Sequence, residues 1–166
     1  MQSASDTMSL LYLVPAISST CSLFFAWDQF VFLRLFLKKD VQPHGNRLQS
    51  SYWKSFFPQA VVVVFAGIGT TAGASFTLMA TQSDILLAKG TYNWYLAGAV
   101  LAIAHLPFAP TIMPTIKRLQ DPKKDVDSGT ATLQKWLRIH TTRALTVDLG
   151  SWICCVVAAT KTLSPQ

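Results

Sequence analysis

Charge is scarce in this sequence. Only 13% of its 166 residues are Asp, Glu, Lys or Arg, about half of the ~25% that is usual in a soluble domain. Hydrophobic residues make up 51% of the chain, and the mean hydropathy is +0.34. The few charges gather in short stretches between long apolar runs. This distribution excludes an ordinary soluble domain and is typical of an integral membrane protein.

Several motifs that identify common enzyme classes are also missing. The sequence has no HExxH zinc motif, phosphate-binding loop, GxSxG motif or Gly-rich dinucleotide signature. It has three cysteines and no CxxC pair, which argues against a thiol–disulfide relay. We therefore predict no metal and no cofactor. The net charge of +6 comes from residues beside the apolar runs, so it predicts contact with a lipid bilayer and no nucleic acid.

Four apolar runs are each long enough to cross a bilayer, which takes about 20 helical residues. We expect spans at approximately 10–37, 59–80, 93–115 and 136–161, within a single membrane domain of residues 1–166. The predicted fold is therefore all-α, an integral membrane four-helix bundle. Pro107, Pro110 and Pro114 should interrupt the third span, because each removes a backbone hydrogen bond and clashes one turn back.

The distribution of Lys and Arg predicts the orientation. Loops 38–58 and 117–135, with their flanks, carry most of these residues, so we expect both loops in the cytosol and both termini in the lumen, at the endoplasmic reticulum. Gly69 and Gly73 form a GxxxG spacing in the second span. Such small-residue faces favour close helix packing and permit a homo-oligomer.

One stretch joins three functional residue types on a single helical stripe. Trp136, His140 and Arg143 follow one another at spacings of four and three, so they share a face where the chain enters the membrane. Ionisable groups inside a span are costly and usually face the bundle interior or a watery cavity. We predict His140 and Arg143 as catalytic and Trp136 as substrate-binding. Alternatively, Trp136 and Arg143 are an interfacial anchor and a snorkelling cation.

Other ionisable groups lie inside the spans at matching depths. A rise of about 1.5 Å per residue places Asp28 close to the depth of Arg143, and His105 close to that of Asp148, so two pairs are predicted. On a regular helix Asp148 would be turned about 100° from the stripe, so the pairs need not share one cavity. His105 and Asp28 complete the predicted catalytic set. An Asp28–Arg143 pair could equally be a structural bridge.

Aromatic residues beside these groups suggest the ligand. Phe24 and Phe25 lie next to Asp28 and would form a wall that suits a flat phenolic or polycyclic molecule. Trp94 and Tyr95 open the third span, and we include them among the substrate-binding residues. The predicted partner is thus a small apolar or phenolic substrate.

The third and fourth spans resemble the anthrone oxygenase family, which consists of small four-span membrane proteins of fungal polyketide pathways and of bacteria. The resemblance rests on Pro114-Thr115 with Leu119, and on the W-xxx-H-xx-R arrangement of Trp136, His140 and Arg143. Tyr52-Trp53 and Pro58 before the second span are also similar. The sequence departs from the family at Ile116 and His140, where Asn is common.

The resemblance implies oxidation of an anthrone to an anthraquinone by O₂ without an evident cofactor. The residues permit such chemistry, since His140 or His105 could remove a proton and Arg143 could stabilise the resulting anion. The same groups would also suit a non-redox cyclase or isomerase acting on a polyketide or terpenoid intermediate. A third alternative is a non-catalytic assembly partner in the membrane.

Overall fold

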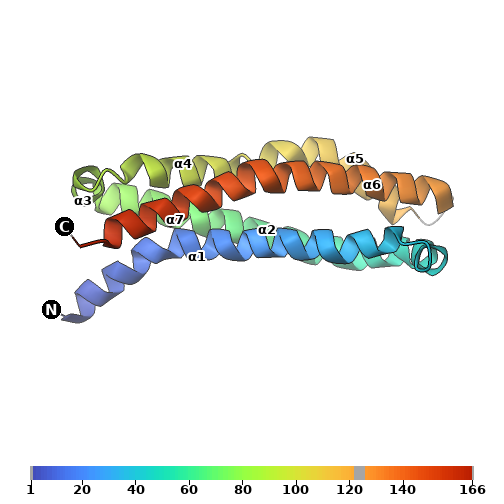
Figure 1. The fold of residues 1–166 in the computed structure, drawn as a ribbon, viewed down its shortest axis with the longest axis horizontal. Coiled ribbons are helices and arrows are strands. Elements are labelled where there is room, and N and C mark those ends of the chain that lie inside the picture. The colour runs from blue at the N-terminus through green and yellow to red at the C-terminus, as the bar shows by residue number, and fades with distance from the viewer. Residues whose placement is uncertain (1, 122–125, 166) are drawn as a thin grey trace.

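The chain folds into long helices that run side by side (Figure 1). The computed structural model describes residues 2–121 and 126–165. Three short helical turns join or interrupt the longer helices: η1 (Arg34–Leu37), η2 (Leu106–Phe108) and η3 (Ala144–Asp148). The α-helices are α1 (Gln2–Leu33), α2 (Gln42–Thr81), α3 (Ser83–Ala88), α4 (Tyr92–Ile103), α5 (Ala109–Gln120), α6 (Val126–Arg143) and α7 (Leu149–Leu163).

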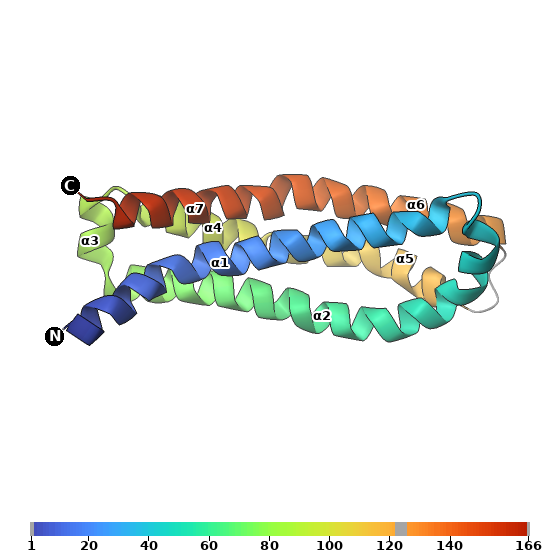
Figure 2. The ribbon, with the colours of Figure 1, turned by 60° about the horizontal axis from the view of Figure 1, so that its bottom comes forward.

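These helices form four long rods, which confirms the all-α membrane bundle. Within the described residues, four segments have the length and apolar composition needed to cross a membrane: Leu10–Leu37, Gln42–Thr81, Tyr92–Gln120 and Gly129–Leu163. The N- and C-termini lie at the same end, beside α3, while η1 lies at the other end (Figures 1 and 2). The antiparallel layout agrees with the predicted one. The side of the membrane that each end faces, and the organelle, remain predictions.

The helices continue well into the segments that we expected to be polar loops. The prediction of a loop over residues 38–58 was wrong for most of that range, because α2 begins at Gln42. Pro43 lies in the first turn of α2, where its missing N–H has no helical partner to lose. Loop 117–135 was also too long, since α5 ends at Gln120 and α6 begins at Val126; its residues 122–125 lie outside the described part. The polar residues show where an apolar run ends. The helices continue beyond those points, so the end of an apolar run and the end of a helix are different positions.

The proline-rich third span is broken at Pro107 and Pro110, as predicted, but not at Pro114, which lies inside the continuous helix α5. α4 ends at Ile103, Pro107 lies in the 3₁₀ turn η2, and α5 starts at Ala109 with Pro110 in its first turn. His105 lies at this break, where its backbone carbonyl accepts from Phe108 N–H at 3.2 Å. The break interrupts the rod between α4 and α5, and His105 lies at that interruption, about halfway along the rod.

Two apolar clusters stabilise the bundle at its opposite ends. The cluster near η1 is built on Trp53 and Trp136, whose rings meet edge-to-face with centroids 5.1 Å apart. The cluster near the termini is built on Tyr95, which is fully buried and donates its hydroxyl to the Tyr12 carbonyl at 2.9 Å. Polar side chains concentrate between these clusters, as described below.

Small residues pack closely at a different place from the one predicted. A Cβ at Gly69 or Gly73 would meet no atom within 4 Å, so this GxxxG face points away from the described bundle. Pairing with a second copy through that face remains a prediction. Gly98 of α4, in contrast, lies against α7, where an added Cβ would be 2.6 Å from Cys155 Sγ.

Gly98→Ala is expected to destabilise the protein by about 1–3 kcal/mol, the usual cost of an overpacked core. Cys155 is fully buried, so its sulfur has little room to move. Gly69→Ala is the matched control, because its Cβ would meet open space and alanine favours the helix. Unfolding in mixed micelles would measure both variants. Equal stability of the two would show that the α4–α7 contact tolerates a methyl group.

Candidate active site

A π-helical turn organises the polar centre of the bundle. The last rod is α-helical through Arg143, π-helical over Ala144–Asp148 and α-helical again from Leu149. In a regular α-helix, residues 143 and 148 would be separated by about 140° around the axis. The wider π turn brings residues five apart onto one face, and such turns are frequent at functional sites. Arg143 Nε therefore donates to Asp148 Oδ2 at 3.1 Å.

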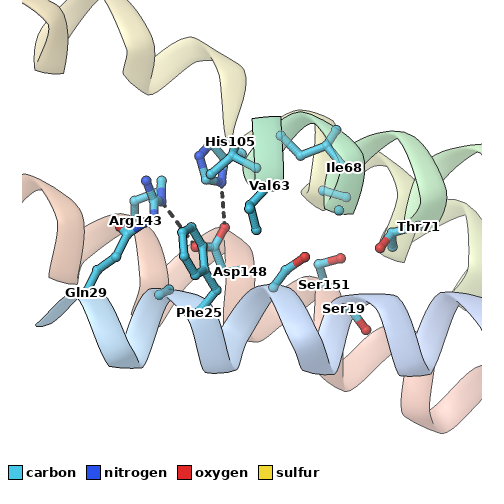
Figure 3. A pocket seen from close by; sticks show the side chains of 15 residues that line it. Ser19, Phe25, Gln29, Val63, Ile68, Thr71, His105, Arg143, Asp148 and Ser151 are labelled. Atoms are coloured by element: carbon cyan, nitrogen blue, oxygen red, sulfur yellow. Dashed lines mark hydrogen bonds and ion pairs between the residues drawn. The ribbon is translucent and has the colours of Figure 1, made fainter. Parts of the chain in front are cut away.

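His105 completes this cluster from the neighbouring rod, where it follows α4. Its Nδ1 lies 3.0 Å from Asp148 Oδ1, so the predicted His105–Asp148 pair is present (Figure 3). Because a carboxylate only accepts hydrogen bonds, Nδ1 carries the proton that is donated. No described residue hydrogen-bonds Nε2 of His105. We refer to His105, Asp148 and Arg143 as the central cluster.

Charge balance indicates how the central cluster is protonated. One carboxylate and one guanidinium cancel each other, and both side chains are about nine-tenths buried. A second positive charge on His105 would leave a net charge inside the membrane, which is costly. A neutral His105 with its proton on Nδ1 therefore fits best, and its Nε2 then carries a free lone pair.

His140 holds Arg143 in place and has no nitrogen left for substrate. Its Nε2 lies 2.8 Å from the Ala26 carbonyl, so this nitrogen is the donor. Its Nδ1 accepts from Arg143 Nη2 at 3.2 Å, and its ring stacks on Trp136 with centroids 4.6 Å apart. The stripe predicted from the sequence exists, but His140 is completely buried within it. Its position where the chain enters the membrane gave no indication of this burial.

His140→Ala is expected to destabilise the fold by about 2 kcal/mol or more. The change leaves the Ala26 carbonyl and one Arg143 N–H without partners and opens a cavity beside Trp136. His140→Asn should retain more stability, because an amide can still donate and accept. Unfolding in mixed micelles would measure the loss; an Ala variant as stable as the wild type would show that these contacts contribute little.

A small polar cavity adjoins the central cluster. Its volume is about 40 Å³, which has room for a few water molecules. Phe25 lines it together with the central cluster (Figure 3), and its role in substrate binding remains a prediction. The remaining polar lining residues are Ser19, Ser22, Gln29, Thr71 and Ser151. Water in this cavity could therefore hydrate the central cluster and exchange protons with it.

A larger apolar chamber reaches the same cluster from the α2–α5 side. Its volume is about 330 Å³, which suits a small organic molecule. His105, Arg143 and Gln29 line both this chamber and the polar cavity. Aromatic side chains form much of its wall: Trp53, Phe56, Phe57, Phe65, Phe108 and Trp136. We call it the aromatic chamber, and its geometry places an apolar ligand against a histidine and an arginine.

Three other predicted residues lie away from this chamber. Phe24 is 66% exposed and lines a separate groove with His140 and Trp27 on the outside of the bundle. Trp94 and Tyr95 belong to the apolar cluster near the termini, where Tyr95 joins α4 to α1. The structure therefore does not bring these aromatic side chains to the central cluster.

The predicted Asp28–Arg143 pair is wrong. The ion pairs of the central cluster join Asp148 to both His105 and Arg143, and Asp28 forms none with any described residue. Asp28 lines neither the polar cavity nor the aromatic chamber. Neighbouring helical residues point about 100° apart, and it is Gln29 that faces inward. Asp28 is therefore turned away from the guanidinium.

Sequence reasoning missed Gln29 and the wall formed by α2. Ser22, Phe25 and Gln29 are spaced by three and four residues, so a helical-face analysis of the first span would have placed Gln29 inward. Trp53 was not among the predicted site residues, whereas it is almost fully buried and lines the aromatic chamber. Among the described residues, no group of three or more His, Cys, Asp or Glu is arranged to hold a metal ion.

Comparison with known proteins finds relatives that match nearly the full length. The chain is 30% identical over 160 residues to Epoxidase pydX of Acremonium sp., covering 94% of this chain and 96% of that protein. It is 28% identical to Epoxidase gkaX of Penicillium citrinum, covering 97% and 99%. Oxaleimides biosynthesis cluster protein N of Penicillium oxalicum is 23% identical, covering 98% and 95%. No protein-family model and no solved structure matches the chain.

Proposed function

Because the chain belongs to the family of secondary-metabolism proteins that includes the epoxidases pydX and gkaX, we propose that it oxygenates an apolar biosynthetic intermediate within the membrane. In the main form of the proposal, one oxygen atom is transferred to a carbon–carbon double bond to give an epoxide. The name of these relatives supports the reaction class. The membrane spans support a substrate that dissolves in lipid.

The observation that carries the proposal is that two residues of the central cluster, His105 and Arg143, line the aromatic chamber. His105 is held by Asp148 with its Nε2 free, and Arg143 lines the same chamber. This is the arrangement of a general base beside a cation that can stabilise a developing oxyanion. It suits a substrate whose acidic C–H or O–H group lies next to an unsaturated, apolar body.

The chemistry can be written without a bound cofactor. His105 Nε2 takes a proton from the substrate, and Arg143 stabilises the enolate or phenolate that remains. This electron-rich anion reduces O₂, and after the proton returns the product is a hydroperoxide that contains both oxygen atoms. Transfer of its outer oxygen to a double bond gives an epoxide and leaves a hydroxyl group, so atoms and electrons balance.

Oxidation of an anthrone is the second candidate, and it shares the first steps. The hydroperoxide on the anthrone methylene carbon would lose water and leave a carbonyl group, which gives the anthraquinone. The aromatic residues of the chamber, among them Trp53, Phe57 and Trp136, favour this candidate because they suit flat rings. The similarity to the anthrone oxygenase family points to the same substrate class.

Labelling with ¹⁸O₂ tests the proposal. The purified protein in lipid nanodiscs would be given an alkyl-tailed 2-allyl-1,3-diketone as the epoxidation probe, and 1,8-dihydroxyanthrone in a parallel sample. We expect an epoxy alcohol with two ¹⁸O atoms from the diketone and a quinone with one ¹⁸O atom from the anthrone. Product without ¹⁸O would indicate the cyclase or isomerase alternative. No product from either probe or from the natural intermediate would leave the assembly-partner alternative.

We also propose where the protein lies in the cell and how it is oriented in the membrane. The Lys and Arg distribution supports an endoplasmic reticulum protein with both termini in the lumen and the η1 end in the cytosol. Cysteine labelling at Asp40, which is exposed before α2, and at Ser128 should occur from the cytosol, and labelling at Gln166 from the lumen.

A further inference from the structure

Gln29 is a buried amide without a protein partner at the border of the two cavities. Gln29 is only 7% exposed, and no described residue forms a hydrogen bond with its side-chain amide. The amide atoms are not completely enclosed by protein, so a group inside the adjoining cavities can supply the missing hydrogen bonds. Figure 3 shows Gln29 on the same side of the polar cavity as Arg143.

Arg143 adds further unused donors at this place. A guanidinium has five N–H groups. Within the described residues, one binds Asp148 and one binds His140, which leaves three without a partner. The Gln29 amide can contribute two more N–H groups and one acceptor. The border between the cavities is therefore rich in donors, and it faces the apolar aromatic chamber.

We infer that Gln29 and Arg143 form a binding site for a carbonyl or enolate oxygen of the substrate. The inference rests on the proposed function only in taking the aromatic chamber as the substrate site. An oxygen held there lies beside His105 Nε2, so the acidic position activated by that carbonyl would face the base. Gln29 thus defines the substrate class: an unsaturated, apolar carbonyl compound bound through its oxygen.

Paired probes that differ by a single carbonyl test this site without turnover. Fluorene and 9-fluorenone share one ring skeleton, and both fit the aromatic chamber. Their binding to the protein in nanodiscs can be followed by quenching of Trp53 and Trp136, with empty nanodiscs correcting for partition into lipid. We expect the wild type to bind fluorenone about tenfold more tightly than fluorene, the effect of a hydrogen bond from a charged or buried donor.

Gln29→Leu should reduce that preference about fivefold and leave fluorene binding unchanged or stronger. Gln29→Met keeps the side-chain length and serves as a second test if leucine disturbs the fold. Gln59→Leu is the matched control, because Gln59 lies on the exposed face of α2 and bonds Ser55.

An unchanged preference in both Gln29 variants, or a wild type with no preference, would overturn the inference. So would an equal loss in Gln59→Leu. The inference and the proposed function can fail separately: selective binding without oxygenation would remove only the function, whereas oxygenation with unselective binding would remove only the Gln29 site.

Discussion

His105→Gln is expected to lower turnover by about 10²-fold or more, the scale of a positioned acid–base group. Glutamine can still donate to Asp148 but has no lone pair of suitable basicity to accept the substrate proton. The fold should persist, because the Arg143–Asp148 pair remains and the His105 side chain is 16% exposed. Turnover of the labelled probe in nanodiscs would measure the loss, with unfolding as the check on the fold.

His44→Gln is the matched control for this experiment. His44 is exposed in the first turn of α2, far along the chain from the central cluster, so the same substitution should leave turnover unchanged. Near-normal turnover in His105→Gln would remove His105 as the base. Because both nitrogens of His140 are already bonded within the protein, that result would require a base outside the described histidines.

Arg143→Gln is expected to destabilise the protein by about 3–5 kcal/mol, because it leaves the Asp148 carboxylate buried without its cation. The His140 nitrogen that accepts from Arg143 also loses a charged donor. The loss would be seen as unfolding at lower denaturant in mixed micelles. Arg138→Gln serves as the control, since Arg138 is exposed on α6, two residues before His140.

A double-mutant cycle separates the ion pair from general damage. Asp148→Asn with Arg143→Gln removes both charges, so the double variant should be milder than the sum of the two single changes by about 1–3 kcal/mol. Additive losses would show that the two side chains do not stabilise each other. The corresponding cycle between Asp28 and Arg143 should be additive, because no contact joins them.

The four spans and the depth of the buried groups were predictable because both follow from composition and helical rise. The His105–Asp148 pair emerged from equal depth alone. The stripe of Trp136, His140 and Arg143 followed from regular helical spacing, and these residues do contact one another. These features depend on local geometry, which an apolar helix repeats reliably.

The rest depends on a departure from that geometry. Sequence spacing assumes a uniform α-helix, so it placed Asp148 away from Arg143 and left Asp28 as the partner. The π turn over Ala144–Asp148 changes the direction in which the following side chains point around the helix axis. No residue type in that segment indicates such a turn. The burial of His140 also could not be predicted from residue spacing. It depends on how closely α1 packs, so that the Ala26 carbonyl accepts a hydrogen bond from His140 Nε2.

Proton removal by His105 before oxygen enters is the central claim, and exchange under argon tests it most directly. The wild-type protein in nanodiscs would be incubated in D₂O with 1,8-dihydroxyanthrone, and deuterium at its acidic carbon would be followed by mass spectrometry. We predict exchange faster than in empty nanodiscs for the wild type and His44→Gln, and background exchange for His105→Gln. Oxygenation in air without catalysed exchange under argon would contradict the claim, because oxygen would then react before any proton leaves.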